Sequence, residues 1–239
     1  MLDPLLAAIV VFFGAFVQTS IGFGLAIVSA PLLFYIDPKL VPVPVTMATL
    51  ANVIFGSWHF RRHLSLRGLL PAAVARLPGS IVGAWLLLTV SVQTLAVFIA
   101  VIIVVGMGIN FSRIRLPFNR FSLSVAGFLS GLMGTATSIG GPPMAIVMQG
   151  QQANAIRGNL AAYFLFSCIV TLVVLAPTGR VGWEQLQLAL PLIPASWLGS
   201  WCASRYSQRI SERWITVGTV LLCGFSVLVM LAQYLGSPT

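Results

Sequence analysis

The sequence predicts an all-α polytopic membrane protein made of two inverted repeats, each a broken re-entrant helix pair followed by three transmembrane helices. The first observation behind this fold class is the composition. Of 239 residues, 58% are hydrophobic and 7% are charged, whereas soluble domains carry about 25% charged residues. The second observation is a repeated motif inside the apolar segments, and the third is the distribution of basic residues among the loops. We therefore expect a multi-pass protein of the cell inner membrane.

The apolar segments follow one another with only short loops between them. Several approach the ~20 residues that a helix needs to cross a bilayer. The longest polar stretch, 112–120, lies midway along the chain. We expect it to be a cytoplasmic linker between a first repeat at 1–111 and a second at 121–239, which together form one membrane domain. The apolar segments are 4–36, 41–60, 68–90, 93–111, 121–150, 158–176, 183–204 and 214–235.

Two motifs recur in the same order in both halves. The stretch TSIGFG at 19–24 returns as TSIGGP at 137–142. The stretch PGSIVGAW at 78–85 returns as PASWLGSW at 194–201, so that both read P-x-S-x-x-G-x-W. Their nearly equal offset predicts a duplicated unit. Duplicated halves are common in transporters, whose binding site lies near the midplane where the halves meet.

The basic residues of the loops predict the course of the chain, because such residues gather on the cytoplasmic side of membrane proteins. If every apolar segment crossed once, they would be divided almost evenly between the two sides. If the two TSIG segments instead enter and return on one side, only Lys39 and Arg180 lie outside, and Arg76 lies within the membrane. Each half then crosses an odd number of times, so the halves are inverted and both termini are extracytoplasmic.

The segment at 4–36 is too long for one simple span and too short for two. Two half-helices of about 15 and 12 residues would reach ~22 and ~18 Å, far enough to meet inside the bilayer. Glycine supplies the backbone freedom for the break, and Pro142 and Pro143 suit the first turn of the returning helix. Two facing helix N-termini with hydroxyl donors beside them predict an anion site. The predicted site residues are Thr19, Ser20, Gly22, Phe23, Gly24, Thr137, Ser138, Gly140 and Gly141, with Gln18 as a further candidate.

Four polar residues inside or beside the apolar segments extend this candidate site. Arg157 follows the second break, where it either binds or gates an anion at the cytoplasmic mouth or is a plain positive-inside residue. Asn52 and Tyr163 are either site contacts or, respectively, an interhelical hydrogen bond and an interfacial side chain. Arg76 has no carboxylate in any segment interior. It either contacts the anion or extends to the inner membrane surface.

At these residues the sequence resembles the TauE/SafE family of sulfite-exporter-like membrane transporters. The resemblance rests on GAFVQTSIGFGLAIVSAPLL at 14–33, GFLSGLMGTATSIGGPPMAIV at 127–147 and IRGNLAAYFLF at 156–166. It covers nearly the whole chain. Many relatives have three glycines at each break, whereas this chain has Gly-Phe-Gly and Gly-Gly-Pro-Pro. The resemblance implies export or import of sulfite and organosulfonates, and occasionally of other carboxylates.

These observations favour a transporter that exports a small sulfur-containing anion, sulfite or an organosulfonate, by alternating access around the two breaks. The alternatives are an anion channel that uses the same re-entrant segments, an importer of a small carboxylate, and a membrane scaffold that transports nothing. We expect no cofactor, no metal and no enzyme activity, because the sequence has no nucleophile–base pair, metal-ligand cluster or phosphate loop. The net charge of +9 fits cytoplasmic loops rather than nucleic acid. Gly127 and Gly131 form a G-x-x-x-G pattern for close helix packing, which could also serve a homodimer face.

Overall fold

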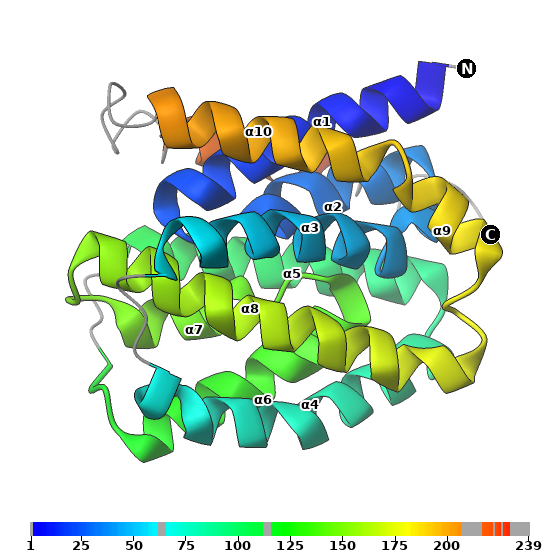
Figure 1. Ribbon diagram of the computed structural model, residues 1–239. Coiled ribbons are helices and arrows are strands. Elements are labelled where there is room, and N and C mark those ends of the chain that lie inside the picture. Colours follow the sequence, from blue (N-terminus) through cyan, green and yellow to red (C-terminus); the bar gives the residue numbers. More distant parts are fainter. Residues whose placement is uncertain are drawn as a thin grey trace.

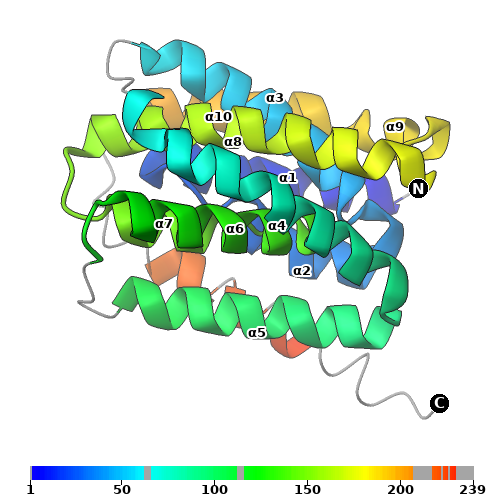
Figure 2. The same ribbon diagram turned by 90° about the horizontal axis from the view of Figure 1, so that it is seen from below.

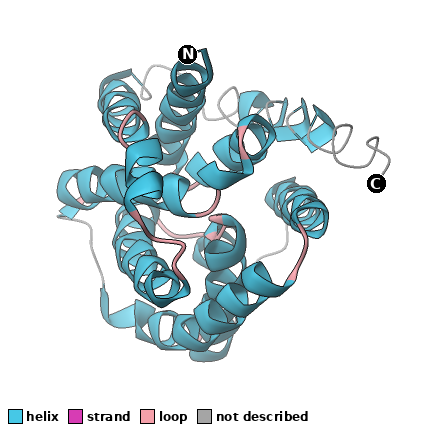
Figure 3. Ribbon diagram, turned by 90° about the vertical axis from the view of Figure 1, so that its right-hand side faces the viewer, coloured by secondary structure: helices cyan, strands magenta, loops and turns pink. Residues whose placement is uncertain are grey.

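The described part of the chain is helical. The structure is a computed structural model that describes residues 2–61, 66–111, 116–206, 217–221, 223–225 and 227–229. Within these residues the elements are α-helices and short 3₁₀-helices, with no strand (Figure 3). The predicted all-α class is therefore confirmed. Parts of the linker predicted at 112–120, and of the last apolar segment predicted at 214–235, lie outside the described residues.

The first apolar segment folds as two helices, α1 (Leu2–Ile21) and α2 (Leu25–Ile36). The break between them adopts positive φ at Gly22 (98°) and Gly24 (126°), a region that side chains other than glycine rarely enter. The predicted interruption therefore lies where the first TSIG motif ends. The first arm has 20 residues, longer than the half-helix of about 15 predicted by its length in the apolar run. Pro4 is tolerated in its first turn, so the helix begins at Leu2, just before the apolar run, and continues to Ile21.

The second TSIG motif also interrupts a helix pair, α6 (Arg120–Thr137) and α7 (Gly141–Met148). Here the chain turns at Ser138, whose φ is 65°. Two side chains stabilise the turn. The Thr137 hydroxyl accepts the Ile139 N–H (3.2 Å), and the Ser138 hydroxyl donates to the carbonyl oxygen of Pro42 (2.7 Å).

The remaining helices follow the predicted segments, except that the segment at 183–204 forms two helices. They separate at residues 190–191, because Pro191 has no N–H to continue the first helix. The helices are α3 (Val43–His59), α4 (Leu70–Thr89), α5 (Val92–Phe111), α8 (Ala153–Leu175), α9 (Trp183–Ala189) and α10 (Leu192–Tyr206), joined by the 3₁₀-helices η1 (Pro38–Leu40), η3 (Leu66–Leu69) and η4 (Ala176–Thr178).

Several helices suit a membrane environment. Among the described residues, those long and apolar enough to cross a bilayer are Pro4–Ile21, Leu70–Thr89 and Ala153–Thr178. Shorter apolar helices cover Leu25–Ile36, Val92–Gly106 and Val217–Val229. Large apolar side chains on the outside of the molecule, such as Phe121 at 78% exposure, suit contact with lipid. The chain is thus a helical membrane protein. The first helix of the first pair, which was predicted to be a half-helix, is itself long enough to cross a bilayer.

The long helices run along one common direction, as seen from below (Figure 2). The two broken pairs open toward opposite ends of this direction (Figure 1). α1 begins and α2 ends at one end, where Pro4, Ile36 and Asp37 line a shared pocket. α6 begins and α7 ends at the other end, near the start of α8 (Figure 1). The two broken pairs therefore point in opposed directions along the bundle (Figure 1).

The two halves interlock through the repeated P-x-S-x-x-G-x-W motif. α4 of the first half packs along α6 of the second, and α10 of the second half packs along α1 of the first. At the contacts, a Cβ on Gly83 would collide with the Leu132 carbonyl oxygen, and one on Gly199 with the Phe12 carbonyl oxygen. Small residues in this motif thus allow two helix backbones to approach closely.

The G-x-x-x-G pattern on α6 has the same purpose. Cβ atoms on Gly127 and Gly131 would collide with the carbonyl oxygens of Ala72 and Arg76 on α4. This face is therefore covered within the chain and is not available to a second copy. A homodimer, which stays a proposal, would have to use another face.

Candidate functional site

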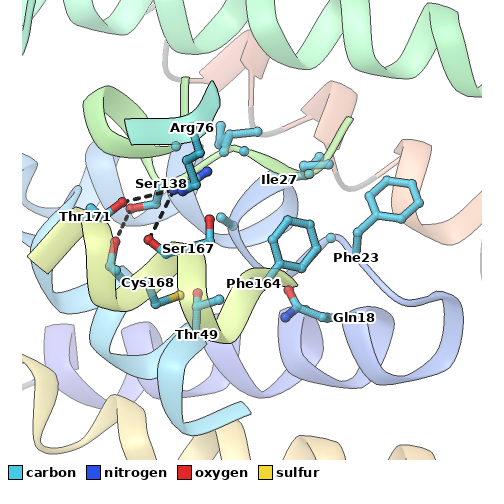
Figure 4. A pocket seen from close by; sticks show the side chains of 17 residues that line it. Gln18, Phe23, Ile27, Thr49, Arg76, Ser138, Phe164, Ser167, Cys168 and Thr171 are labelled. Atoms are coloured by element: carbon cyan, nitrogen blue, oxygen red, sulfur yellow. Dashed lines mark hydrogen bonds between the residues drawn. The ribbon is translucent and has the colours of Figure 1, made fainter. Parts of the chain in front are cut away.

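A cavity lies between the two helix breaks (Figure 4). The space open to the centre of a water-sized sphere is about 40 Å³, which is room for about three waters or one small ion. The first break provides Gln18, Phe23 and Gly24, and the second provides Ser138, Gly140 and Gly141. The other lining residues come from helices α2, α3, α4, α6 and α8 and from the second break: Ala26, Ile27, Thr46, Thr49, Arg76, Gly134, Ile139, Phe164, Ser167, Cys168 and Thr171.

Arg76 is the charged residue of this cavity, and its side chain is only 2% exposed. One terminal nitrogen, Nη1, donates to the Ser130 hydroxyl (3.0 Å). The other, Nη2, donates to the Ser167 carbonyl oxygen (3.3 Å) and the Thr171 hydroxyl (3.1 Å) on α8. The Nε–H has no protein partner. Since a guanidinium has five N–H donors, part of its donor capacity remains for a ligand.

No carboxylate lies beside this buried cation among the described residues. Asp37 accepts the Lys39 N–H, and Glu184 pairs with the Lys39 ammonium (2.7 Å), both at the exposed end of the bundle. The hydrogen bond to Glu184 raises the pKa of Lys39. An ion buried without a partner costs several kcal/mol. The cavity is therefore electropositive and favours a bound anion.

The prediction that Arg76 could extend to the membrane surface is wrong. The residue lies within α4 on the face that packs against α6, and Gly134 of α6 leaves space for its guanidinium. From the sequence alone, the long flexible side chain of an arginine in an apolar segment is expected to reach the membrane surface. The sequence does not reveal that a helix of the other half covers this side chain.

Hydroxyl groups complete the polar wall, and sequence analysis missed most of them. Thr46 and Thr49 lie on α3, and Ser167 and Thr171 lie on α8. Each pair is spaced three or four residues apart, so its members share one helix face. That spacing of hydroxyls within apolar segments is a signal that could have found them.

The N-terminus of α2 offers fewer free N–H groups than predicted, since the Leu25 N–H donates to Oε1 of Gln18 (3.1 Å). At the second break, the Gly140 N–H already donates to the Ser138 carbonyl oxygen (3.2 Å). Pro142 and Pro143 have no N–H at all. Gly141 is thus the one residue of the first three in α7 that has a backbone donor. Arg76 and the hydroxyls, rather than two helix ends, therefore dominate the donor set.

A second, smaller chamber adjoins the first break. Gln18, Thr19, Gly22, Asn52 and Arg157 line it. The Asn52 amide donates to Ser200 of α10 (2.6 Å) and, more weakly, to Thr19 (3.4 Å). Asn52 thus makes the interhelical hydrogen bond that was one of its two predicted roles. It also faces this chamber. The structure therefore divides the predicted site residues between two spaces.

Three predicted site residues line neither space. Ser20 is buried and donates to the Phe16 carbonyl oxygen (2.7 Å). Thr137 donates to the Met133 carbonyl oxygen (2.8 Å) while capping the break. The Tyr163 ring lies behind Arg76, with its centroid 5.8 Å from the guanidinium carbon, and its hydroxyl has no partner. These side chains support the walls of the site rather than lining it.

Comparison with protein families decides the membership of the chain. The model of the sulfite exporter TauE/SafE family matches residues 6–230 of 239. The chain belongs to the TauE/SafE family. Comparisons with curated proteins and with solved structures gave no match. Membership confirms the resemblance carried by the two TSIG stretches and makes this TauE/SafE protein a membrane transporter of the sulfur-anion class.

The described residues form no candidate metal site. No group of three His, Cys, Asp or Glu side chains that could hold a metal comes together in them. Transport rather than catalysis is also the activity of the TauE/SafE family.

Proposed function

We propose that this protein exports a small sulfur-containing oxyanion, sulfite or an organosulfonate, across the cytoplasmic membrane and binds it at Arg76 between the two helix breaks. The observation that carries the proposal is a fully buried arginine without a carboxylate partner, in a cavity to which both breaks contribute. An anion there would offset the cost of the buried charge.

The donor set suits an ion with several oxygens. The planar guanidinium of Arg76 can bond two oxygens at once. The Ser167 hydroxyl lies at the same cavity and can donate to a third, whereas the Thr46 and Ser138 hydroxyls already donate to the Pro42 carbonyl oxygen. Phe23 and Phe164 provide an apolar wall that would accept the alkyl group of a sulfonate.

The two opposed broken pairs support alternating access between inverted repeats, with the site near the membrane midplane. Export of an anion from a negative interior is favoured by ~2.3 kcal/mol per charge per 100 mV. Export therefore needs no coupled ion.

An anion channel and an importer of a small carboxylate are the competing functions. A channel predicts large single-channel currents and little saturation, whereas a transporter predicts saturable flux and exchange. A carboxylate importer predicts that acetate or a short dicarboxylate competes better than sulfite. Flux measurements in proteoliposomes with sulfite, methanesulfonate, sulfate and acetate separate the three.

Arg76→Lys tests the proposed site. Lysine keeps the charge but loses the planar fork that reaches Ser130 and Thr171 together, so we expect anion affinity to fall at least about tenfold. The measurement is the anion concentration that half-maximally raises the melting temperature, together with flux in proteoliposomes. Arg120→Lys, a matched change at an exposed position, is the control. Wild-type affinity and flux in Arg76→Lys would remove Arg76 from the site.

A further inference from the structure

Gln18 lines both the central cavity and the second chamber. It lies near the end of α1, and its side chain is 6% exposed. In Figure 4 it lies below Phe164, on the side of the cavity opposite Arg76. The residue is thus part of the wall that separates the two spaces.

The orientation of the Gln18 amide follows from its one hydrogen bond. Its oxygen accepts the Leu25 N–H (3.1 Å), and only an oxygen can face that donor. The amide nitrogen, Nε2, is therefore fixed on the other side, buried and without a partner. A buried amide donor left unpaired costs about 1–3 kcal/mol. Such a group indicates a ligand that passes or binds beside it.

The second chamber contains a cation of its own. Arg157 lies on the second turn of α8, directly against the first break. The Cβ that Gly22 lacks would lie 3.4 Å from the Arg157 Cα and 3.7 Å from its Cγ, and Gly22 has a φ of 98°. Glycine therefore allows α8 to bring Arg157 against the end of α1. The chamber combines this cation with the amides of Gln18 and Asn52.

The second chamber has only about 10 Å³ open to the centre of a water-sized sphere, the room of about one water. We propose that it widens during transport into a separate binding station for the transported oxyanion, and that the Gln18 amide nitrogen donates to the anion as it moves between Arg157 and Arg76. This inference rests on the proposed function. An anion that moved between the two cations without a donor would lose its hydration with nothing in exchange, which is strongly unfavourable. One amide midway supplies that donor, and its oxygen stays bonded to α2 throughout.

Gln18→Glu and Gln18→Met separate this role from that of a helix cap. Glutamate keeps an oxygen for the Leu25 N–H, so the ligand-free melting temperature should stay at the wild-type value or rise. Both variants lack the amide donor, and we expect transport in proteoliposomes at pH 8 to fall at least about tenfold in each. Glutamate also adds a negative charge to the path of the anion, so the neutral variant decides: wild-type transport by folded Gln18→Met would overturn the proposal.

Arg157→Gln tests the station itself, with Arg120→Gln as the control that removes one exposed charge. We expect Arg157→Gln to reduce transport at least about tenfold, while methanesulfonate still raises the melting temperature with a wild-type midpoint through Arg76. Transport by Arg157→Gln equal to that of Arg120→Gln would overturn the station and leave the central site standing. If Arg76→Met instead keeps wild-type stabilisation by methanesulfonate, the proposed function itself fails.

Discussion

At the scale of single residues, Arg76 combines three properties that conflict in a protein without a ligand. It is charged, it is buried, and the hydrogen bonds it donates go to hydroxyl and carbonyl groups rather than to a carboxylate. Its hydroxyl partners are also satisfied elsewhere, since Ser130 donates to the Gly140 carbonyl oxygen (2.7 Å) and Thr171 bonds Thr135 (3.2 Å). Ser130 and Thr171 therefore do not need the guanidinium as a hydrogen-bond partner, which indicates that Arg76 serves to bind an anion.

This predicts an unusual effect of Arg76→Met. The substitution removes an uncompensated buried charge and largely fills its volume, so the ligand-free protein should melt at or above the wild-type temperature. Stabilisation by sulfite or methanesulfonate should be lost. Melting curves in detergent with and without each anion measure both effects. A large loss of stability without anions would mean that Arg76 holds the fold together.

Ser138 shows a second conflict, between backbone conformation and side-chain bonding. Its left-handed φ of 65° costs an L-residue about 1–2 kcal/mol. Its hydroxyl donates to Pro42 and lies 3.1 Å from the Thr46 hydroxyl. The side chain thus links the second break to the start of α3.

Substitution by alanine and by glycine should separate these two terms. Ser138→Ala loses the hydrogen bond and keeps the strain, while Ser138→Gly loses the bond and relieves the strain. We expect the glycine variant to be the more stable of the two by about 1 kcal/mol. Thermal denaturation of both purified variants tests this. Equal stability would show that the turn at Ser138 is unstrained.

The sequence could identify the break residues but not all of their roles. The repeated TSIG motif predicted both helix breaks. The residue with positive φ is glycine at the first break and Ser138 at the second. The side chains of Ser20 and Thr137 face their own helices, because a hydroxyl in a helix can bond the carbonyl four residues earlier. The burial of Arg76 could not be predicted from the sequence, because its environment depends on a helix from the other half.

At the scale of elements, close helix contacts set the geometry of the site. α4 can present Arg76 to the cavity because Gly79 and Gly83 allow it to lie against the α6 backbone. The repeated P-x-S-x-x-G-x-W motif predicted a duplication. Its role in packing could not be predicted, because it depends on which helices lie against α4 and α10. The split between α9 and α10, by contrast, was readable from Pro191.

The packing account predicts that Gly83→Ala and Gly199→Ala destabilise the protein. Each new methyl group would collide with a backbone carbonyl oxygen, and overpacking of this kind costs about 1–3 kcal/mol. Gly108→Ala on α5 is the matched control, since nothing lies within 4 Å of its added Cβ. Melting temperatures of the three variants provide the test. Wild-type stability in Gly83→Ala would mean that α4 and α6 are more loosely packed.

At the scale of the whole molecule, the halves repeated in sequence are not separate bodies in space. α4 and α10 exchange places, each packing along the broken helix of the other half. Movement of either broken pair must therefore displace a helix of the opposite half. Sequence patterns predicted two halves and opposed directions, but this exchange depends on long-range contacts that no local pattern encodes.

The predicted topology can be tested by labelling single cysteines in a variant without Cys168, Cys202 and Cys223. A cysteine at Gln152, before α8, should react from the cytoplasmic side. Cysteines at Lys39 and Arg180 should react only from outside. All three positions are exposed. Labelling of Gln152 and Arg180 from the same side would contradict a single crossing by α8 and, with it, the inverted arrangement.

The central claim is that the transported anion binds at Arg76 between the two breaks. Selenite has the shape and charge of sulfite and scatters X-rays anomalously, so its position can be measured directly in crystals of the protein. We predict an anomalous peak within hydrogen-bond distance of the Arg76 guanidinium, with the Ser167 hydroxyl as a further donor. A peak confined to surface arginines, with the central cavity empty at saturating selenite, would contradict the account.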